Sequence, residues 1–338
     1  MLPPALLPTL VLDRFYYETR EMLMKRRILG IVLLILAIEL ILVIPVLVFT
    51  PLGVHLLHDL APSPPPTPIL TVVGTPPVVN ARAVYLMDAD TGHVLDDVHG
   101  EQRLPMASTT KIMTALIAIQ KGNLDQVVTI QQDAFNEVQK HNGSSANLVV
   151  GDRIRLKDLL YGLMLPSGDD AAIAIADAVS GTTSNFVRTM NLFARQLHLT
   201  QTHYINPDGL TYMTPQGQPD PNQYTTAADL VRLTRSAMIN PFFAQLVELQ
   251  HYILPASTFH HAYTWDSIDT LLSTYPGATG VKTGYTLEAG YCLVFSAISG
   301  GHHLIGALLH EQDADQRFID ARTLLDWGFA LPLRPPVS

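Results

Sequence analysis

The order of apolar and polar positions divides the chain into a strand-rich start, a helical middle and a strand-rich end. Two short apolar runs, 83–88 and 93–97, are joined through Asp90-Thr91-Gly92, a pattern that predicts a β-hairpin. Helical spacing then predicts helices over 108–120, 156–164, 170–179, 184–198 and 226–238, with short strands near Arg153 and Tyr252. Strands return at 281–284, 291–298 and 303–309, before a closing helix over 314–329.

Strands at both ends of the sequence, with helices between them, predict an α/β (α+β) fold. We expect one antiparallel sheet built from the N- and C-terminal strands and flanked by helices, with the mainly helical middle inserted as a lobe. A site would lie where the lobe meets the sheet edge. Ser108, which opens the helical part, and Lys282, in a C-terminal strand, are expected to face each other there.

One apolar stretch precedes this pattern. Ile28 to Thr50 is a run of 23 residues whose only charge is Glu39. As a helix it would be roughly 34 Å long, against a hydrocarbon core of about 30 Å, so it predicts an N-terminal transmembrane helix. Lys25-Arg26-Arg27 lie directly before it, which places residues 1–27 in the cytoplasm and the chain after about residue 50 outside.

A cleaved secretory signal is the alternative to an anchor. Its apolar region usually has only about 7 to 15 residues, and Thr50-Pro51-Leu52-Gly53 is a poor cleavage site, so we favour an uncleaved anchor. Residues 61–77 hold seven prolines and predict a stiff, extended stalk. The predicted organisation is a cytoplasmic tail at 1–27, a transmembrane anchor at 28–50, a proline-rich linker at 51–77, a folded domain at 78–330 and a tail at 331–338.

Charge and cysteine content narrow the classes of function. The net charge is −9, and it is −11 when residues 1–27 are left out, which disfavours nucleic acid binding. The single cysteine, Cys292, excludes an internal disulfide and is predicted to be a packed strand residue. No His-Glu-x-x-His spacing and no glycine-rich phosphate loop occurs, so we expect neither a metal nor another cofactor.

The candidate chemistry begins at Ser108-Thr109-Thr110-Lys111, directly before a long apolar run. Residues three apart on a helix share a face, so the Ser108 hydroxyl and the Lys111 amine can meet within hydrogen-bond reach. Serine is a weak nucleophile that needs a base, and a buried lysine near a second cation can serve as one. Taken alone, this spacing more often marks an ordinary start of a core helix.

Two further motifs change that balance. Ser167-Gly168-Asp169 lies in a loop between two predicted helices, and Lys282-Thr283-Gly284 lies on a predicted strand. In this order the three motifs resemble the serine penicillin-interacting fold, and most closely the D-alanyl-D-alanine carboxypeptidases, the low-molecular-mass penicillin-binding proteins. Family patterns recur in between, in stretches such as 163–168, 203–210, 224–230, 275–284 and 324–329, so the resemblance covers about 78 to 330.

The resemblance implies a role for each motif residue. Ser108 would attack the carbonyl of the penultimate D-alanine of a peptidoglycan stem peptide, Lys111 would take its proton, and Ser167 would relay a proton to the leaving amine. Lys282 and Thr283 would hold the terminal carboxylate of the peptide, and the Tyr285 N–H would stabilise the oxyanion. The residues implied to bind the substrate are Asp169, Lys282, Thr283, Gly284 and Tyr285. Lys282 also supplies the second cation near Lys111, and Gly284 would leave room for the substrate backbone. β-Lactams are expected to inhibit by acylating Ser108.

Asp169 departs from the family pattern, which usually has asparagine there. An ionised carboxylate only accepts hydrogen bonds, and close to Lys111 it would favour the charged amine and weaken the base. We therefore expect an active enzyme with a raised pH optimum or a reduced rate. The alternative is that the Asp169 side chain points toward the helix N-terminus and has no such effect.

A membrane-anchored serine D-Ala-D-Ala carboxypeptidase is the function that these patterns favour. A D,D-endopeptidase of the same family would use the same residues. A β-lactamase is less favoured, because no convincing Glu-x-x-Leu-Asn segment follows Ser167. The rival from another class is a penicillin-binding sensor or scaffold in which Asp169 has blunted turnover.

Overall fold

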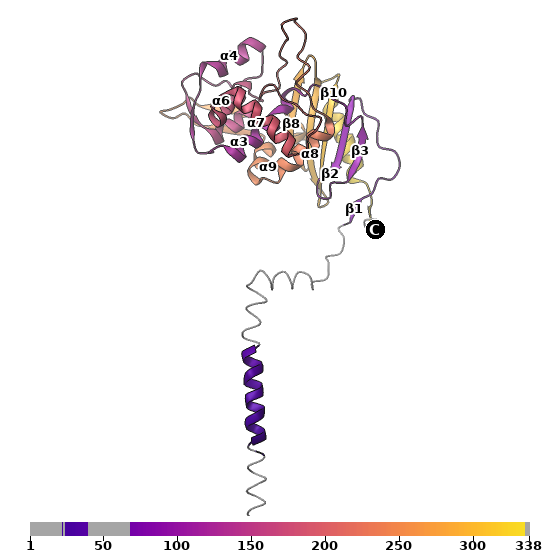
Figure 1. Ribbon diagram of the computed structural model, residues 1–338. Coiled ribbons are helices and arrows are strands. Elements are labelled where there is room, and N and C mark those ends of the chain that lie inside the picture. The colour runs from indigo at the N-terminus through magenta and orange to yellow at the C-terminus, as the bar shows by residue number, and fades with distance from the viewer. Residues whose placement is uncertain (1–21, 23, 40–67, 335–338) are drawn as a thin grey trace, which may run out of the picture. The chain divides into compact units, whose positions relative to one another are not determined.

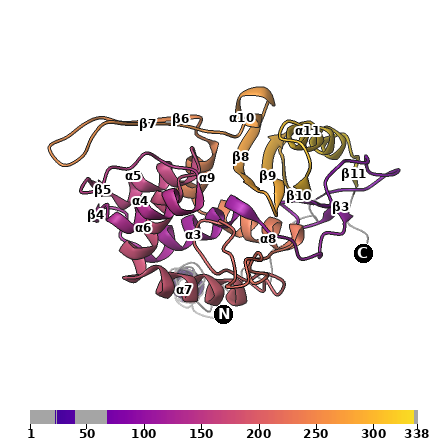
Figure 2. The ribbon, with the colours of Figure 1, turned by 90° about the horizontal axis from the view of Figure 1, so that it is seen from above.

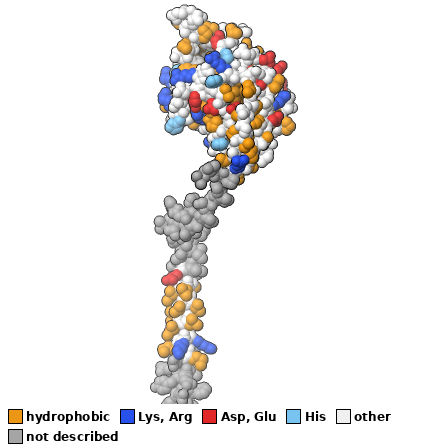
Figure 3. Space-filling view, turned by 90° about the vertical axis from the view of Figure 1, so that its right-hand side faces the viewer, with side chains coloured by type: hydrophobic (Ala, Val, Ile, Leu, Met, Phe, Trp, Pro, Cys, Tyr) orange, Lys and Arg blue, Asp and Glu red, His pale blue; other side chains and the backbone are white. Residues whose placement is uncertain are grey.

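The computed structural model describes residues 22, 24–39 and 68–334. The chain forms two compact units, Met1–Pro66 and Thr67–Ser338. In the first unit, residues 24–39 are helical, with exposed apolar side chains along the helix and Lys25, Arg26 and Arg27 at one end (Figures 1 and 3). Across the described ranges, no helix combines the length and the apolarity needed to cross a membrane. Residues 40–50 of the predicted anchor lie outside the described residues, so the anchor stays a prediction.

The second unit is built on a five-stranded antiparallel sheet in the order β3-β2-β10-β9-β8. Its strands are β2 (Ala83–Asp88), β3 (Val94–Val98), β8 (Ala278–Thr286), β9 (Gly290–Ser299) and β10 (His302–Glu311). The N-terminal hairpin forms one edge and β8 the other, with β10 joining the two ends of the sequence. The prediction of a single sheet assembled from both ends is confirmed.

Both faces of this sheet are covered, because its inner strands are apolar on both sides. Along β2, Tyr85 and Met87 point into the core under the helical lobe, whereas Val84 and Leu86 pack toward α11 (Gln316–Phe329). Figure 2 shows α11 against one face of the sheet, with α3 (Lys111–Lys121) and α8 (Ala227–Met238) on the other side. Burial on two faces explains why β2 is an unbroken apolar run and not an alternating one.

The lobe contains the helices that the sequence predicts, each within two residues of its expected bounds. They are η1 (Ala107–Thr110) with α3, then α5 (Leu156–Met164), α6 (Asp169–Ser180), α7 (Thr183–Gln196) and α8. The sequence did not predict α4 (Gln132–His141), α9 (Pro241–Glu248) or α10 (Leu271–Thr274). α4 has only three apolar residues in ten, and α9 and α10 are shorter than the stretch of about 11–18 residues over which helical spacing is recognised.

Short strand pairs complete the unit. β4 (Val127–Thr129) pairs with β5 (Arg153–Arg155), and β6 (His251–Leu254) pairs with β7 (Tyr263–Asp266). β1 (Ile69–Leu70) pairs with β11 (Leu333–Arg334), so stretches that the sequence assigned to the linker and the tail contribute to the folded unit. Two-residue strands carry too few positions for a recognisable alternation.

Candidate active site

A single 3₁₀ turn, η1, carries Ser108 at the start of the buried helix α3. Thr109 Oγ1 donates to the Met106 carbonyl at 2.6 Å and Thr110 Oγ1 to the Ala107 carbonyl at 2.8 Å, which closes the turn. Ala107 adopts φ 47°, in the left-handed region that residues with a side chain rarely occupy. The surrounding contacts therefore hold a strained turn, and Ser108 is left half-buried at its surface.

Lys111 connects this turn to the lobe. Its side chain is fully buried, and Nζ donates to Ser108 Oγ at 2.9 Å, to Asp169 Oδ1 at 2.5 Å and to the Asp208 carbonyl at 2.9 Å. An ammonium has three hydrogens, so these three acceptors match its full donor capacity. The Ser108–Lys111 contact expected from the spacing is present.

The second motif approaches from the loop between α5 and α6. Ser167 is buried with φ 66°, and the Gly168 and Asp169 amides donate to the carbonyls of Gly162 at 3.0 Å and Ser144 at 2.9 Å. The Asp169 carboxylate is directed at Lys111 and forms a buried ion pair with it. Burial raises the pKa of Asp169, and the positive charge of Lys111 opposes that rise. Of the two orientations considered for Asp169, the structure therefore has the one that contacts the amine.

The third motif lies on β8, the edge strand. Lys282 is buried, and its Nζ donates to the Thr283 carbonyl at 3.2 Å. Burial, reinforced by the positive charge of Lys111, holds the pKa of Lys282 well below its ordinary value. Thr283 Oγ1 is buried and has no hydrogen-bond partner within the described part of the chain. Tyr285 is exposed, and its ring stacks on Tyr291 with centroids 4.4 Å apart.

Two glycines allow the backbone segments of the site to approach one another. A Cβ added to Gly284 would lie 3.1 Å from Ala107 Cβ and 3.1 Å from Ser108 N, so the missing side chain makes room for η1 itself. Gly209 has φ 93°, and an added Cβ would overlap the Ala107 carbonyl. The space beside Gly284 is thus taken by this chain and not by a substrate, and the predicted substrate contact of its backbone stays a prediction.

Three charged residues in this region were not selected from the sequence. The Asp208 carbonyl accepts a hydrogen bond from Lys111. The Asp208 carboxyl is fully buried, and burial and the nearby charge of Asp169 raise the pKa of this carboxyl well above its ordinary value. Burial raises the pKa of Asp269 to about 6, and Lys282 and Arg317 oppose that rise. Arg317 Nη1 donates to the Gly284 carbonyl at 3.2 Å. Asp208 lies inside a family-like stretch, but no motif marks Asp269 or Arg317.

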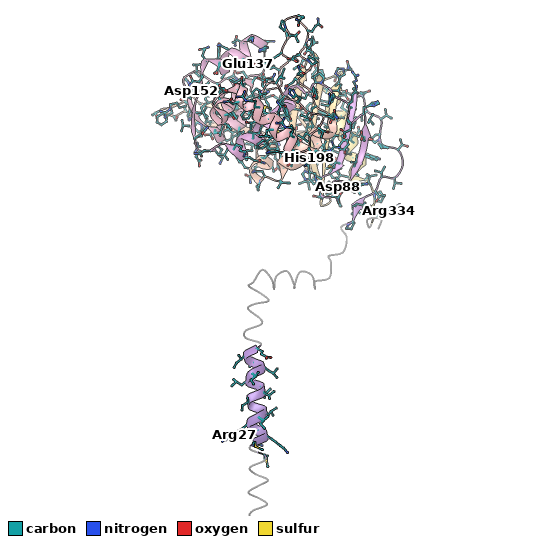
Figure 4. The ribbon with its side chains drawn as sticks, viewed as in Figure 1. Arg27, Asp88, Glu137, Asp152, His198 and Arg334 are labelled. Atoms are coloured by element: carbon teal, nitrogen blue, oxygen red, sulfur yellow. The ribbon has the colours of Figure 1, made fainter. Side chains whose placement is uncertain are left out.

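A further acidic residue, Glu137, lies near Asp208. Tyr212 Oη donates to Glu137 Oε1 at 2.8 Å, and the Tyr212 ring stacks on His141 with centroids 4.8 Å apart. Glu137 lies on α4 of the lobe, on the side away from Asp88 and the sheet (Figure 4). Within the described ranges, no three His, Cys, Asp or Glu side chains are grouped to hold a metal ion.

The Ser108–Lys111 contact has the geometry that a serine hydrolase requires of a nucleophile and its base. The model of the D-alanyl-D-alanine carboxypeptidase family, peptidase family S11, matches residues 71–313. The D-alanyl-D-alanine carboxypeptidase of Streptomyces sp. strain K15 is 37% identical over 269 residues, 76% of this chain and 90% of the relative. Escherichia coli DacC is 33% identical over 274 residues, which cover 78% of this chain and 66% of DacC.

Solved structures agree with this assignment. The crystal structure of the Streptomyces K15 DD-transpeptidase superposes with a TM-score of 0.71 at 38% identity, covering 76% of this chain and all of the other. The D-alanyl-D-alanine carboxypeptidase of Mycobacterium tuberculosis H37Rv has a TM-score of 0.69 at 33% identity, covering 79% and 96%. The chain belongs to the D-alanyl-D-alanine carboxypeptidase family.

Proposed function

We propose that this protein is a serine-type D-Ala-D-Ala carboxypeptidase that removes the terminal D-alanine from peptidoglycan stem peptides and is acylated by β-lactams. The observation that carries the proposal is the 2.9 Å contact from Lys111 Nζ to Ser108 Oγ at the junction of lobe and sheet. Family membership supports the substrate class, and the complete burial of Lys111 supports its role as the base.

In the proposed acylation, Ser108 Oγ attacks the carbonyl carbon of the penultimate D-alanine, and the Ser108 proton passes to a neutral Lys111 amine. The carbonyl oxygen becomes an oxyanion, which the Ser108 and Tyr285 amides would hold. The C–N bond then breaks, and D-alanine leaves with a proton relayed through Ser167. Water attacks the resulting ester, releasing the shortened peptide and restoring Ser108.

Substrate orientation would come from β8. The terminal carboxylate of the peptide would accept hydrogen bonds from Lys282 Nζ and Thr283 Oγ1. Lys282 Nζ makes one hydrogen bond within the described residues, and buried Thr283 Oγ1 has no partner there. A buried hydroxyl without a partner costs about 1–3 kcal/mol, which a bound carboxylate would recover.

The charges around Lys111 have opposite effects on whether its amine is charged or neutral. Two buried amines, Lys111 and Lys282, repel each other when both are charged, which favours a neutral base. The Asp169 carboxylate at 2.5 Å favours the charged form instead. We propose that the balance leaves the enzyme active, with its optimum displaced to higher pH.

Release of D-alanine from a pentapeptide ending in D-Ala-D-Ala tests the proposal, with Ser108→Ala as the comparison. Release by the unaltered protein and loss in the variant is the expected result. Labelling of Ser108 by a fluorescent penicillin without any release of D-alanine would instead identify a sensor or scaffold. Cleavage of cross-linked dimers in preference to the pentapeptide would identify an endopeptidase.

The structural similarity favours one further candidate. The K15 structure is named a DD-transpeptidase, so the acyl-enzyme of the present chain could pass to an amine acceptor instead of water. Adding an amino-acid acceptor to the pentapeptide assay distinguishes the two. A transferred product in place of the hydrolysed tetrapeptide would identify transpeptidation.

We also propose that residues 28–50 anchor the protein in the cell membrane, in a single pass, with the catalytic domain outside the cytoplasm. The apolar run and the preceding Lys25-Arg26-Arg27 support this, and residues 24–39 are helical. Membrane fractionation, followed by protease digestion of intact and lysed spheroplasts, is the test. A fully soluble protein, or a catalytic domain protected in intact spheroplasts, would contradict it.

A further inference from the structure

Helix α4 and the residues after it lie against the groups that hold the buried Lys111 amine, although apolar packing does little to fix the helix. Of its ten residues, only Ala134 is buried. Asn142, with φ 50°, ends the helix, and the chain then passes beside Asp169. Because so little apolar surface is buried, the position of α4 depends mainly on polar contacts.

The first of these contacts is with Asp169, the carboxylate paired with Lys111. The Ser144 carbonyl accepts a hydrogen bond from the Asp169 amide at 2.9 Å. Gly143 lies so close that an added Cβ would overlap Asp169 Oδ2 and would be 3.2 Å from Leu210 Cδ1. Residues 143 and 144 therefore hold the carboxylate from outside.

The second contact is with the loop that begins at Asp208. Tyr212 Oη donates to Glu137 Oε1 on α4 at 2.8 Å. Tyr212 is four positions after Asp208, whose carbonyl accepts from Lys111. Burial, together with the charges of Asp208 and Glu137, raises the pKa of Tyr212 above its ordinary value, so the phenol keeps its proton and remains a donor. This hydrogen bond joins α4 to the segment that holds the amine.

The surroundings of this hydrogen bond strengthen it. The His141 ring stacks on the Tyr212 ring with centroids 4.8 Å apart, and His141 Nε2 lies 3.6 Å from Glu137 Oε1. The side chains of Glu137 and His141 are only 14% and 16% exposed. A hydrogen bond to a carboxylate is stronger than one between neutral groups, and partial exclusion of water strengthens it further.

We propose that the Tyr212–Glu137 hydrogen bond holds Lys111 in its catalytic position, so that Glu137 and Tyr212 are positioning residues for acylation. The inference rests on the proposed function, in which Lys111 is the base. Neither Glu137 nor Tyr212 takes part in bond making or breaking.

The effect reaches Lys111 through its two other acceptors. Asp169 and the Asp208 carbonyl take two of the three hydrogens of the amine, and the third is thereby directed at Ser108 Oγ. When the hydrogen bond is lost, α4 and residues 143–144 are free to move, and both acceptors shift with them. A displacement of about 1 Å in a catalytic group can cost about 10²-fold in rate.

Tyr212→Phe is the first test, because it removes one hydroxyl and keeps the ring beside His141. Acylation by a reporter penicillin is followed by stopped flow over a range of concentrations. The series separates the rate constant of bond formation from the dissociation constant of the complex that precedes it. We expect bond formation to slow by about threefold to tenfold, with the dissociation constant unchanged. A parent-like rate constant would overturn the proposal.

Two replacements of Glu137 separate positioning from charge. Glu137→Gln keeps an acceptor oxygen and removes the charge, whereas Glu137→Ala removes both. Positioning predicts that Glu137→Gln retains most of the parent rate and that Glu137→Ala slows bond formation as much as Tyr212→Phe does. Combining Glu137→Ala with Tyr212→Phe should give no further loss, because both remove the same interaction. Equal loss in Glu137→Gln and Glu137→Ala would assign the effect to charge and overturn the proposal.

Tyr252→Phe is the matched control. Tyr252 Oη donates to Asp158 Oδ1 at 2.7 Å, which is the same kind of hydrogen bond between β6 and α5 of the same lobe. This variant should acylate at the parent rate. Slowing as large as that of Tyr212→Phe would show a general effect of a lost hydrogen bond in the lobe, and would overturn the proposal.

Amide hydrogen exchange tests the same contacts without any reaction. The amides of Gly143 and Asp169 donate to the carbonyls of Val138 and Ser144, so their exchange rates report whether the end of α4 stays in place. Exchange should be faster in Tyr212→Phe and unchanged in Tyr252→Phe. Unchanged exchange in Tyr212→Phe would overturn the proposal, whereas an unaltered protein that no penicillin acylates would overturn the proposed function instead.

Discussion

Lys111 Nζ lies 2.5 Å from Asp169 Oδ1, and both side chains are buried. The group that must accept a proton from Ser108 is therefore paired with a carboxylate, which stabilises its charged form. The same amine also donates to Ser108 Oγ, so the ion pair positions the base correctly while opposing its deprotonation.

Asp169→Asn should move the pH profile of acylation to lower pH. Removing the carboxylate that pairs with the amine removes an interaction that favours its charged form, so we expect acylation to become faster near neutrality. Stopped-flow acylation by a reporter penicillin, over about pH 5 to 10, measures it. Asp266→Asn, at an exposed position on β7, is the control. An unmoved profile would show that Asp169 does not govern the base.

Ser108→Ala should abolish labelling by a fluorescent penicillin and lower D-alanine release by about 10³-fold or more. The variant leaves the buried Lys111 amine without one of its three acceptors, which costs about 1–3 kcal/mol, so the fold should be retained with a modestly lower melting temperature. Gel fluorescence and a D-alanine assay measure the two effects. Ser273→Ala, on the exposed surface of α10, should retain both activities. Persistent labelling of Ser108→Ala would place the nucleophile elsewhere.

Gly209→Ala should destabilise the protein by roughly 2–5 kcal/mol, because it adds a left-handed backbone cost to a steric overlap with the Ala107 carbonyl. The displaced carbonyl would also disturb η1, so acylation should slow by more than the loss of folded protein explains. Gly217→Ala is a matched control, since Gly217 has φ 70° but open space around it, and should cost only about 1–2 kcal/mol. Denaturant unfolding measures both variants. Equal losses would exclude the overlap as the cause.

Stability should fall as the pH rises toward 8, because burial and the nearby Asp320 raise the pKa of Glu311 to about 8. The folded pKa lies above the unfolded one, so the native state holds the proton more tightly. The contribution is complete below about pH 4.5 and is lost as the pH rises through 8, with a slope of at most about 1.4 kcal/mol per pH unit.

Thermal unfolding at several pH values between about 5 and 8 measures this effect. Glu311→Gln should flatten the dependence, whereas Glu248→Gln, at an exposed position, should keep it. A parent protein whose melting temperature does not fall over this range would contradict the assignment to Glu311.

Much of the fold was predictable because its signals are local. The apolar spacing of α5 and α8, and the turn between β2 and β3, depend only on neighbouring residues. The helix α4 was not predicted, since only three of its ten residues, Ala134, Phe135 and Val138, are apolar. The assembly of one antiparallel sheet from both ends of the chain also followed from the sequence, because strands at the two ends with helices between them favour that arrangement. The strand order β3-β2-β10-β9-β8 came only from the structure.

The contacts of the site, like the elements of the fold, were predictable from the sequence only in part. By itself, the sequence determined that Ser108 and Lys111 share a helix face, and the three motifs indicated the family. Tertiary structure alone decided that Asp169 turns toward Lys111, that the Asp208 carbonyl completes the donor set of the amine, and that Gly284 makes room for η1. These contacts join residues 58 to 177 positions apart, so they arise only when distant segments of the chain pack together. The degree of burial that alters each charge arises from the same packing.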